Sequence, residues 1–522
     1  MKLSAFGVTA RTVTIERENE SRYRTKEEIS VSVNGSTVLK TDKNVFTLFG
    51  LDPDTEYKIE TSDGGSLDIK TAKETVLFDV RRFGAKGHGE VEEGAFIQAA
   101  IEACPEGGTV YVPKGTYLCR PLFMKSGITL YLEKEARLLA VTDRKLYPIL
   151  PGTIRRTDDD REEICLGSWE GNPLDQFASL ITAIGVKNFT LTGGGIIDGN
   201  AASSDWWVEH RVKRIAWRPN LIYFTGCENI VFSGIKVCNS PVWNVHPAYS
   251  KNIELLDLMI ENPSDSPNTD GIDPESCEDV LILGTHISVG DDCVAIKSGK
   301  LYMAEKHFRR TERVTVRNCL FEKGHGGVTV GSEIAGGVVG VRVLKSVFKN
   351  TDRGIRIKTR RGRGEKSYLD DISCTNMIMD HVHMPLTVNM FYFCDPDGHS
   401  SYVQDKGEHE KDDQTPKIGC ISFEDVECTG TEAMFVCAWG LPEEPIEKIS
   451  LKNVNVSYAA PADRKADRPI MTDDFEKVNG KTLFIKNVKE LEIENVNISG
   501  EDVSAPDIAE DTKADLSGLK IN

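Results

Sequence analysis

Long apolar runs are missing from this chain. No stretch of about 18 apolar residues occurs in it, so the sequence predicts no membrane-spanning helix and no membrane partner. Polar residues interrupt the N-terminal stretch MKLSAFGVTARTVTIERENE at once, which leaves no apolar core for a secretory leader. We therefore expect a cytoplasmic protein.

Positive charge is scarce as well. The chain holds 63 lysines and arginines against 81 acidic residues, for a formal net charge of -18. A negative field of this size argues against nucleic acid as a main partner. It leaves room for a small anionic ligand, because one local basic patch can override a diffuse acidic field.

Paired cysteine motifs are also absent. The 13 cysteines are scattered singly, with no CxxC. An odd number of isolated cysteines predicts reduced thiols rather than disulfides or a metal site. We expect no metal and no cofactor.

The chain does contain enough apolar sequence for a large folded core. Hydrophobic residues make up 39% and charged residues 28%, which is typical of a folded globular protein. At 522 residues the chain exceeds one ordinary core. Two domains, or one domain and a repeat array, are the expected organisations.

Residues 1–76 have the pattern of a small antiparallel β-sandwich. Short alternating stretches such as ISVSV, VFTLF and YKIE are separated by polar turns, without a helical period. The segment LDPDTEYKIE at 51–60 resembles the turn and tyrosine corner of fibronectin type III domains, with Tyr57 as the corner residue.

Residues 77–522 contain a repeat that predicts an all-β fold. An apolar stretch with a polar or glycine break recurs at intervals of about 23–34 residues, for example around Ile230, Ile253 and Val280. Helix-length segments are missing between the strands, so a right-handed parallel β-helix fits best. A propeller or sandwich would need hairpin turns that are mostly absent. One helix is predicted at 95–104, with Phe96, Ala99, Ile101 and Cys104 on its apolar stripe, and it would cap the first coil.

Four consecutive repeats carry polar motifs, namely NTDGID (268–273), GDDC (290–293), GHGG (324–327) and RIK (356–358). Coils of a β-helix stack about 5 Å apart, so residues one coil apart in sequence meet on one face. The spacing predicts one surface patch that contains three or more acids, an imidazole and two cations.

Carboxylates in a cluster can differ in protonation state and so take different catalytic roles. Asp270, Asp291 and Asp292 cannot all ionise cheaply at close range, so at least one should keep its proton and serve as a general acid. Ionised partners could activate water, and hydrolysis of a glycosidic bond needs this pair of roles. Adjacent residues of a regular strand point to opposite faces, so we expect a bend at Gly290 that turns both Asp291 and Asp292 into the cleft.

Together the four motifs resemble the signature of glycoside hydrolase family 28, the polygalacturonases, and the resemblance extends over about 78–522. It implies a parallel β-helix enzyme that hydrolyses α-1,4-galacturonosidic bonds with inversion. By position, Asp291 would protonate the leaving oxygen, while Asp270 and Asp292 would hold and deprotonate water. An inverting pair is expected about 6.5–9.5 Å apart.

The same resemblance implies further site residues. His325 would support the proton state of the acid. Substrate contacts are predicted for Arg356, Lys358, Asn268, Gly326 and His246. Arg361 is also predicted to contact substrate, from the basic stretch at 353–366, with a solvated loop as the alternative. An arginine fork and a lysine point charge suit the carboxylate that each galacturonate carries.

Other polar and aromatic residues are open candidates. Asp273 is interpreted as structural, as are His381 and His383. Contact with sugar rings and packing are the alternatives for Trp206, Trp207 and Trp243. Substrate contact and a solvated loop are the alternatives for Arg360 and Arg363. Arg218 lies in a stretch that resembles bacterial members of the family and is a candidate for the substrate-binding end.

The mode of attack is expected to be exo. Long insertions at 144–178, 200–219 and 394–417 could wall off one end of a groove. Two alternatives are hydrolases: an endo-acting enzyme, and a hydrolase of rhamnogalacturonan or xylogalacturonan. Two others are a calcium-dependent pectate lyase and a polysaccharide-binding protein without catalytic activity. The sequence makes no prediction of oligomeric state.

Overall fold

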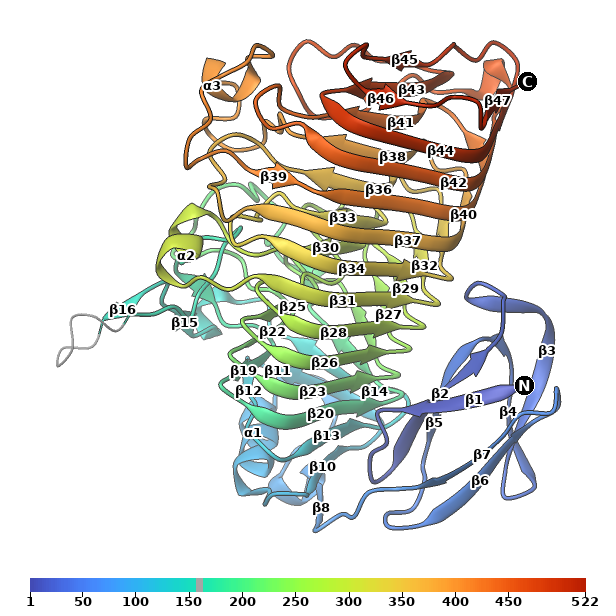
Figure 1. Cartoon of the computed structure of the whole chain (residues 1–522). Helices are drawn as coiled ribbons and strands as arrows, with labels where there is room; N and C mark the ends of the chain where they lie inside the picture. The colour runs from blue at the N-terminus through green and yellow to red at the C-terminus, as the bar shows by residue number, and fades with distance from the viewer. Residues whose placement is uncertain (156–162) are drawn as a thin grey trace.

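The computed structural model describes residues 1–155 and 163–522 and consists mainly of strands (Figure 1). Seven strands at the N-terminus form two antiparallel sheets. One sheet has the order β1 (Lys2–Phe6), β2 (Thr12–Glu18) and β5 (Val45–Phe49), and the other has the order β4 (Ser36–Lys43), β3 (Arg24–Val33), β6 (Glu56–Thr61) and β7 (Ser66–Lys70).

Alternating apolar residues build the core of this sandwich. Val13, Ile15, Val31 and Ile59 are fully buried between the two sheets. The hydroxyl of Tyr57 accepts a hydrogen bond from the backbone N–H of Asp52 at 2.9 Å, which is the contact predicted for a tyrosine corner. The predicted β-sandwich is present, whereas the finer resemblance to fibronectin type III domains stays a prediction.

Beyond Leu77 the chain winds into a parallel β-helix, so the predicted fold class is confirmed. Its largest sheet contains two stacks of strands. The first stack contains β8 (Leu77–Asp79), β10 (Thr109–Val112), β13 (Thr129–Leu132), β20 (Lys187–Gly193), β23 (Glu228–Ser233), β26 (Lys251–Leu256), β28 (Glu278–Leu283), β31 (Thr311–Arg317), β34 (Val338–Leu344), β37 (Tyr368–Asp380), β40 (Cys420–Thr431), β42 (Ile446–Tyr458) and β44 (Val488–Ser499). The second stack contains β9 (His88–Glu92), β11 (Gly115–Cys119), β14 (Ala136–Ala140), β21 (Ile196–Asp198), β24 (Lys236–Cys238), β27 (Met259–Glu261), β29 (His286–Ser288), β32 (Leu320–Glu322) and β35 (Val347–Lys349), and it joins the first at β37.

The register of this sheet follows the sequence repeat. Ile230 pairs with Ile253, Ile253 with Val280, Val280 with Val314, and Val314 with Val341. All five side chains are buried. A one-residue slip would turn each of them toward solvent, so the apolar pattern by itself specifies the register.

A second wall of the β-helix is made by two smaller parallel sheets. The first contains β12 (Leu122–Phe123), β19 (Ile181–Ile184), β22 (Ile222–Thr225) and β25 (Val245–Ala248), and the second contains β30 (Val294–Ile296), β33 (Val328–Val330), β36 (Arg353–Lys358), β38 (Met384–Asn389), β41 (Met434–Trp439), β43 (Lys481–Lys486) and β45 (Asp507–Ile508). Ile272 forms bridges to both Val245 and Val294 and so connects the two sheets.

The predicted capping helix is α1 (Gly94–Ala103), at the N-terminal end of the β-helix (Figure 1). Its buried stripe agrees with half of the prediction. Ile101 and Cys104 are buried as predicted, whereas Phe96 and Ala99 are exposed. Ile97 and Ala100 are buried instead, because residues at i, i+3 and i+4 lie on one face of a helix.

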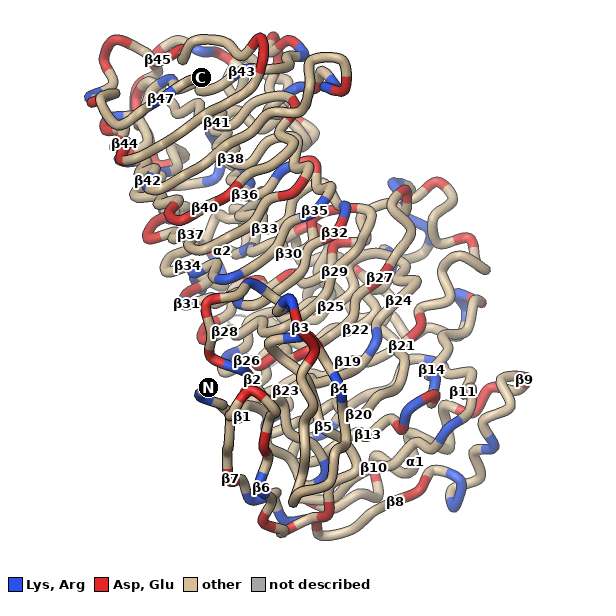
Figure 2. Tube along the Cα trace, turned by 90° about the vertical axis from the view of Figure 1, so that its right-hand side faces the viewer, with Lys and Arg blue, Asp and Glu red and all other residues tan. Residues whose placement is uncertain are grey.

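The sandwich packs against the large sheet of the β-helix, and in Figure 2 it faces the viewer. Both carboxylate oxygens of Glu16 accept hydrogen bonds from Arg317, at 2.8 and 2.7 Å. Val45 packs on Leu256 and Leu283. In Figure 1 the sandwich lies on one side of the β-helix, and the short helix α2 (Leu301–Lys306) lies on the other.

Two predictions about composition can be compared with the structure. All 13 cysteines are free, and Cys394 and Cys420 are exposed. Among the residues with a described placement, no helix has both the length and the apolar character needed to cross a membrane.

Candidate active site

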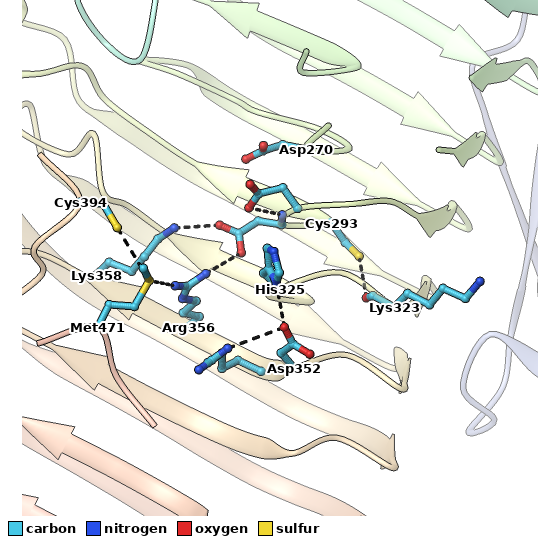
Figure 3. A network of polar contacts seen from close by, with 12 residues as sticks. Asp270, Cys293, Lys323, His325, Asp352, Arg356, Lys358, Cys394 and Met471 are labelled. Carbon is cyan, nitrogen blue, oxygen red and sulfur yellow. Dashed lines mark hydrogen bonds and ion pairs between the residues drawn. The ribbon is translucent and has the colours of Figure 1, made fainter. Parts of the chain in front are cut away.

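A cleft of about 1170 Å³ runs along the outside of the β-helix. All residues that line it belong to the segment between Trp169 and Lys477, so the sandwich does not contribute to it. The four sequence motifs meet here, and the cleft is lined by Asp270, Asp291, Asp292, His325, Arg356 and Lys358. Figure 3 shows Asp270, His325, Arg356 and Lys358 near one another.

Turns between short strands place the carboxylates. Asp291 and Asp292 lie between β29 (His286–Ser288) and β30, and the backbone N–H of Gly271 donates to the carbonyl of Asp292 at 3.0 Å. Gly290 is required by a close approach, because a Cβ there would lie 2.3 Å from the carbonyl oxygen of Ser266. The turn therefore admits only glycine, and it presents both aspartates to the cleft as expected.

The three carboxylates are close neighbours. Asp270, Asp291 and Asp292 each offer one oxygen, and these oxygens all lie within 4.8 Å of one another. Two oxygens that share one water are about 4.5 Å apart, so a single water fits among them. The oxygens are closer than the expected separation of about 6.5–9.5 Å, and the distance alone gives no support to inversion.

Two cations hold Asp292 in its ionised form. Arg356 Nη1 lies 3.2 Å from one oxygen of Asp292, and Lys358 Nζ lies 2.8 Å from the other (Figure 3). Burial by itself would raise the pKa of Asp292, but Lys358 and Arg356 outweigh it and hold the pKa far below its usual range. Asp292 is therefore a carboxylate at any pH near neutral.

Asp270 is in the opposite situation. Burial, together with the neighbouring Asp273 and Asp291, raises the pKa of Asp270 well above its usual range. Burial also raises the pKa of Asp273, which is fully inaccessible. Lys297 Nζ lies 3.8 Å from Asp270 and 3.5 Å from Asp273 and counteracts the rise. The proton predicted for the acid cluster is thus held at the pair of Asp270 and Asp273.

His325 is oriented by a carboxylate that sequence reasoning missed. Its Nδ1 lies 2.7 Å from Asp352 Oδ2, and its backbone N–H donates to the carbonyl of Asp291 at 3.1 Å. The hydrogen bond to Asp352 raises the pKa of His325, and the charge of Asp291 adds to the rise. The imidazole thus carries a proton more readily than a free histidine.

The predicted insertions form walls around this site. Trp169 and Trp217 stack with ring centroids 4.4 Å apart and line one part of the cleft together with His210 and Arg211. Residues 392–396 and His399 line another part. Residues 156–162, inside the insertion predicted at 144–178, lie outside the described residues.

Two predicted substrate contacts are wrong. His246 is fully buried, with Nε2 2.7 Å from Glu275 and Nδ1 2.8 Å from Asn220, so both ring nitrogens are occupied by protein groups. Arg361 is 1% exposed and pairs with Glu443 at 2.5 Å. Its other donors go to backbone carbonyls, so it fixes a loop instead of binding a ligand.

Two further residues of the motifs lie at the cleft, where they support neighbouring side chains. Asn268 lines the cleft, and its side-chain oxygen accepts a hydrogen bond from Arg218 at 2.8 Å. Arg218 is buried, with its remaining bonds on the carbonyls of Pro241 and Pro267. At Gly326 a Cβ would lie 2.6 Å from Asp292 Oδ1, so glycine is needed to leave room for that carboxylate.

Of the tryptophans, arginines and histidines for which alternatives were left, some lie in the cleft and others are buried or lie elsewhere on the surface. Trp243 lines the cleft, and Lys297 Nζ lies 4.4 Å from its ring. Trp206 is fully buried in a separate apolar cluster, against which Trp207 packs. Arg360 and Arg363 both pair with Asp395. His381 and His383 pair with Asp380 and Glu432 outside the cleft, as a structural interpretation implies.

The sequence motifs did not identify the charged residues that surround the predicted site. Lys297 lies 3.8 Å from Asp270, Asp352 lies 2.7 Å from His325, and Glu333 pairs with Lys297 at 3.1 Å. A lone lysine directly after the apolar strand VAI was the available signal, because a charge at a buried position must be paired. Trp169 and Trp217 gave no comparable signal.

The acid cluster is poorly suited to a cation such as calcium. Carboxylate oxygens are the ligands that calcium prefers. However, each oxygen of Asp292 already faces a side-chain cation, Arg356 or Lys358, so its charge is neutralised. The donor set therefore fits ion pairing better than metal binding.

Comparison with protein families identifies two matches along the chain. Residues 165–473 match the family described as "Glycosyl hydrolases family 28", and residues 77–131 match "Rhamnogalacturonase A/epimerase, pectate lyase-like". The first match spans more than half of the chain and includes all four motifs.

Similar proteins and structures agree with the family match. A "Probable polygalacturonase" of Vitis vinifera is 31% identical over 388 residues, which cover 73% of this chain and 74% of that protein. An "Endo-polygalacturonase" of Pectobacterium carotovorum subsp. carotovorum is 27% identical, covering 69% and 83%.

Solved structures show the same fold. An exopolygalacturonase from Thermotoga maritima superposes with a TM-score of 0.62 at 24% identity, covering 81% of this chain and 91% of that one. A family 28 exopolygalacturonase from Yersinia enterocolitica superposes with a TM-score of 0.67 at 18% identity, covering 100% and 98%.

Proposed function

Because the chain belongs to glycosyl hydrolase family 28 and is therefore a glycoside hydrolase, we propose that it hydrolyses α-1,4-galacturonosidic bonds in pectin-derived galacturonides. The names of its relatives, which are polygalacturonases, support galacturonan as the substrate. Arginines and lysines in the cleft of an otherwise acidic protein suit a substrate that carries a carboxylate on each sugar.

The observation that carries the proposal is the unequal charge of the three carboxylates. Asp292 is kept ionised by Arg356 and Lys358, whereas Asp270 shares a buried proton site with Asp273. An ionised carboxylate accepts a hydrogen bond from the attacking water, and a carboxylate with a raised pKa is the stronger base. Asp292 therefore orients the water, and Asp270 takes its proton while the shared buried proton lies on Asp273.

Asp291 is the proposed proton donor to the leaving oxygen. It is the most accessible of the three acids, since Asp270 and Asp292 are buried. His325 lies beside it with an imidazole that Asp352 orients. Protonation by Asp291 on one side of the scissile bond, and attack by water from the other, invert the anomeric carbon.

Exo attack is the finer part of the proposal. The stacked Trp169 and Trp217 on one part of the cleft, and the segment 392–399 on another, narrow the path of a long chain. Relatives named for endo action and similar structures named for exo action both occur. The walls favour short oligogalacturonides with one end bound.

The test follows products from trigalacturonate and from polygalacturonate. Exo action releases small saturated sugars from the start, with little loss of viscosity. NMR of the first product reports whether its anomeric configuration is inverted. Polygalacturonate that loses viscosity early would instead show endo action.

The same experiment distinguishes two alternative activities, a lyase and a hydrolase of rhamnogalacturonan. An unsaturated product that absorbs in the ultraviolet and needs calcium would show a lyase and refute hydrolysis. Cleavage of rhamnogalacturonan in preference to galacturonan would refute the substrate, and the match of residues 77–131 is the reason to include that polymer.

A cytoplasmic location also stays a proposal. It is supported by 13 free cysteines, because disulfides persist mainly in oxidising compartments. Fractionation of cells that produce the protein from its native gene tests it, and recovery of the protein outside the cytoplasm would refute it.

A further inference from the structure

A second group of reactive side chains lies outside the cleft. Glu163 on β17 (Glu163–Ile164) and Cys165 belong to the insertion that forms a cleft wall, and His307 directly follows α2. Cys165 Sγ lies 3.5 Å from His307 Nε2, His307 Nε2 lies 3.1 Å from Glu163 Oε1, and Cys165 Sγ lies 3.7 Å from Glu163 Oε1. The three atoms form a triangle.

The triangle has the dimensions of one face of a zinc tetrahedron. Zinc binds Cys sulfur at about 2.3 Å and His nitrogen or carboxylate oxygen at about 2.0–2.1 Å. With tetrahedral angles, these bond lengths place sulfur about 3.5 Å from either light atom, and nitrogen about 3.3 Å from oxygen. The three distances in this structure lie within a few tenths of an ångström of those values.

Hydrogen bonding accounts for two of the three contacts, because Glu163 Oε1 can accept from both His307 and Cys165, but it gives no role to the 3.5 Å approach of sulfur to nitrogen. A neutral imidazole nitrogen makes one hydrogen bond, as donor or as acceptor. Here the thiol and the carboxylate both approach the same atom, His307 Nε2. A cation at the centre would satisfy all three groups at once, because each would give it a lone pair.

A neighbouring residue orients the carboxylate as it would in a metal site. The hydroxyl of Tyr302 donates to Glu163, with its oxygen 2.8 and 3.0 Å from the two carboxylate oxygens. Metal-binding carboxylates usually accept such an additional hydrogen bond. Arg155 is the nearby cation, but it is largely exposed and lies 3.6 Å from Glu163 Oε2, on the other oxygen.

We propose that Glu163, Cys165 and His307 bind a zinc ion, with water as the fourth ligand. The mixture of thiolate, imidazole and carboxylate favours zinc over calcium or magnesium, which take oxygen ligands. The site lies apart from the cleft carboxylates, and its role is structural.

The ion would tie the cleft wall to the β-helix. Cys165 precedes Trp169 and Glu170, which line the cleft. The backbone N–H of Lys300 donates to the carbonyl of Gly171 at 2.9 Å, so the wall already touches the start of α2 there. Zinc would add a second attachment at His307, at the other end of that helix.

The first experiment measures metal in the full chain. Protein purified without chelator should retain about one zinc per chain by elemental analysis. The variants C165S and H307Q should lose it. C420S is the matched control, because Cys420 is exposed and takes no part in the cluster. Equal zinc in C165S and the parent chain would overturn the proposal.

Cobalt replaces zinc in a spectroscopic version of the test. A thiolate ligand gives cobalt(II) a charge-transfer band, and a tetrahedral site gives it intense visible bands. Both should be present in the parent chain and in C420S but absent in C165S. Cobalt bound without the sulfur band would place the ion at other residues and would refute the site.

A conservative variant distinguishes metal binding from simple loss of folding. Tyr302→Phe leaves all three ligands in place and removes only the hydrogen bond to Glu163. Its zinc affinity, measured by competition with a chromogenic chelator, should fall about 10-fold. An unchanged affinity, together with unchanged zinc in C165S, would leave the cluster as a hydrogen-bonded loop contact.

Discussion

Lys297 is the most informative residue to remove, because one buried ammonium serves three carboxylates. Its Nζ lies 3.1 Å from Glu333, 3.5 Å from Asp273 and 3.8 Å from Asp270, and its side chain is 4% exposed. Lys297→Met keeps much of the apolar stem and deletes the charge. Truncating one partner of a buried ion cluster costs about 3–5 kcal/mol, since the remaining charges stay buried without compensation.

The pH dependence of this loss has a definite sign. Burial would raise the pKa of Glu333, but Lys297 outweighs it and leads the cations that hold the pKa below its usual range. A depressed pKa contributes stability above the unfolded value of about 4.3, and that stability is lost as pH falls. The difference between parent and K297M should therefore be largest near neutral pH and shrink below about pH 4.

The assay is denaturant unfolding at several pH values, followed by tryptophan fluorescence. Lys236→Met is the control, because Lys236 pairs with Glu261 at 2.5 Å on a partly exposed surface. Exposed pairs contribute about 0–1 kcal/mol. If K297M lost no more stability than K236M, or lost the same amount at every pH, the charge cluster would not be as described.

Three catalytic predictions follow. Asp291→Asn should lower kcat by about 10²–10⁴-fold with an unchanged melting temperature, because it removes a proton donor but little packing. Lys358→Met removes a cation that lowers the pKa of Asp292, so kcat/KM at about pH 4 should fall roughly 10-fold more than at pH 7 as the acidic limb moves to higher pH. Asp352→Asn should let the pKa of His325 fall, and the alkaline limb of the profile of kcat/KM should move to lower pH.

Each of these variants has an outcome that contradicts the reasoning. Near-native turnover in D291N would exclude Asp291 as the acid. A uniform loss at all pH values in K358M would indicate substrate binding alone, and Lys358→Arg should restore the acidic limb if the charge is what matters. An unmoved alkaline limb in D352N would mean that His325 does not titrate in the active range.

Much of the architecture follows from local pattern. Strand register is set by apolar residues such as Ile230 and Ile253, whose side chains must face the interior in every coil. The motif order also places Asp270, Asp291 and His325 near one another, because stacked coils convert a sequence interval into a short distance. The bend at Gly290 was predictable from the need to turn two adjacent aspartates to one face.

Other residues could not be assigned from the motifs. His246 resembles a substrate ligand in sequence, yet the fold buries it against Glu275. Arg361 lies in a basic stretch, yet it forms a buried ion pair with Glu443, which is distant in the sequence. The cluster of Glu163, Cys165 and His307 unites segments more than 140 positions apart.

The sequence by itself determined the β-helix, its register and the identity of the acids, because periodic burial and glycine turns are local properties of the chain. Tertiary structure decided which acid keeps a proton and which stays charged. Asp292 meets Arg356 and Lys358, whereas Asp270 meets Asp273. Those charge states depend on burial and on distances of a few ångströms between different coils, and neither quantity exists until the coils are stacked.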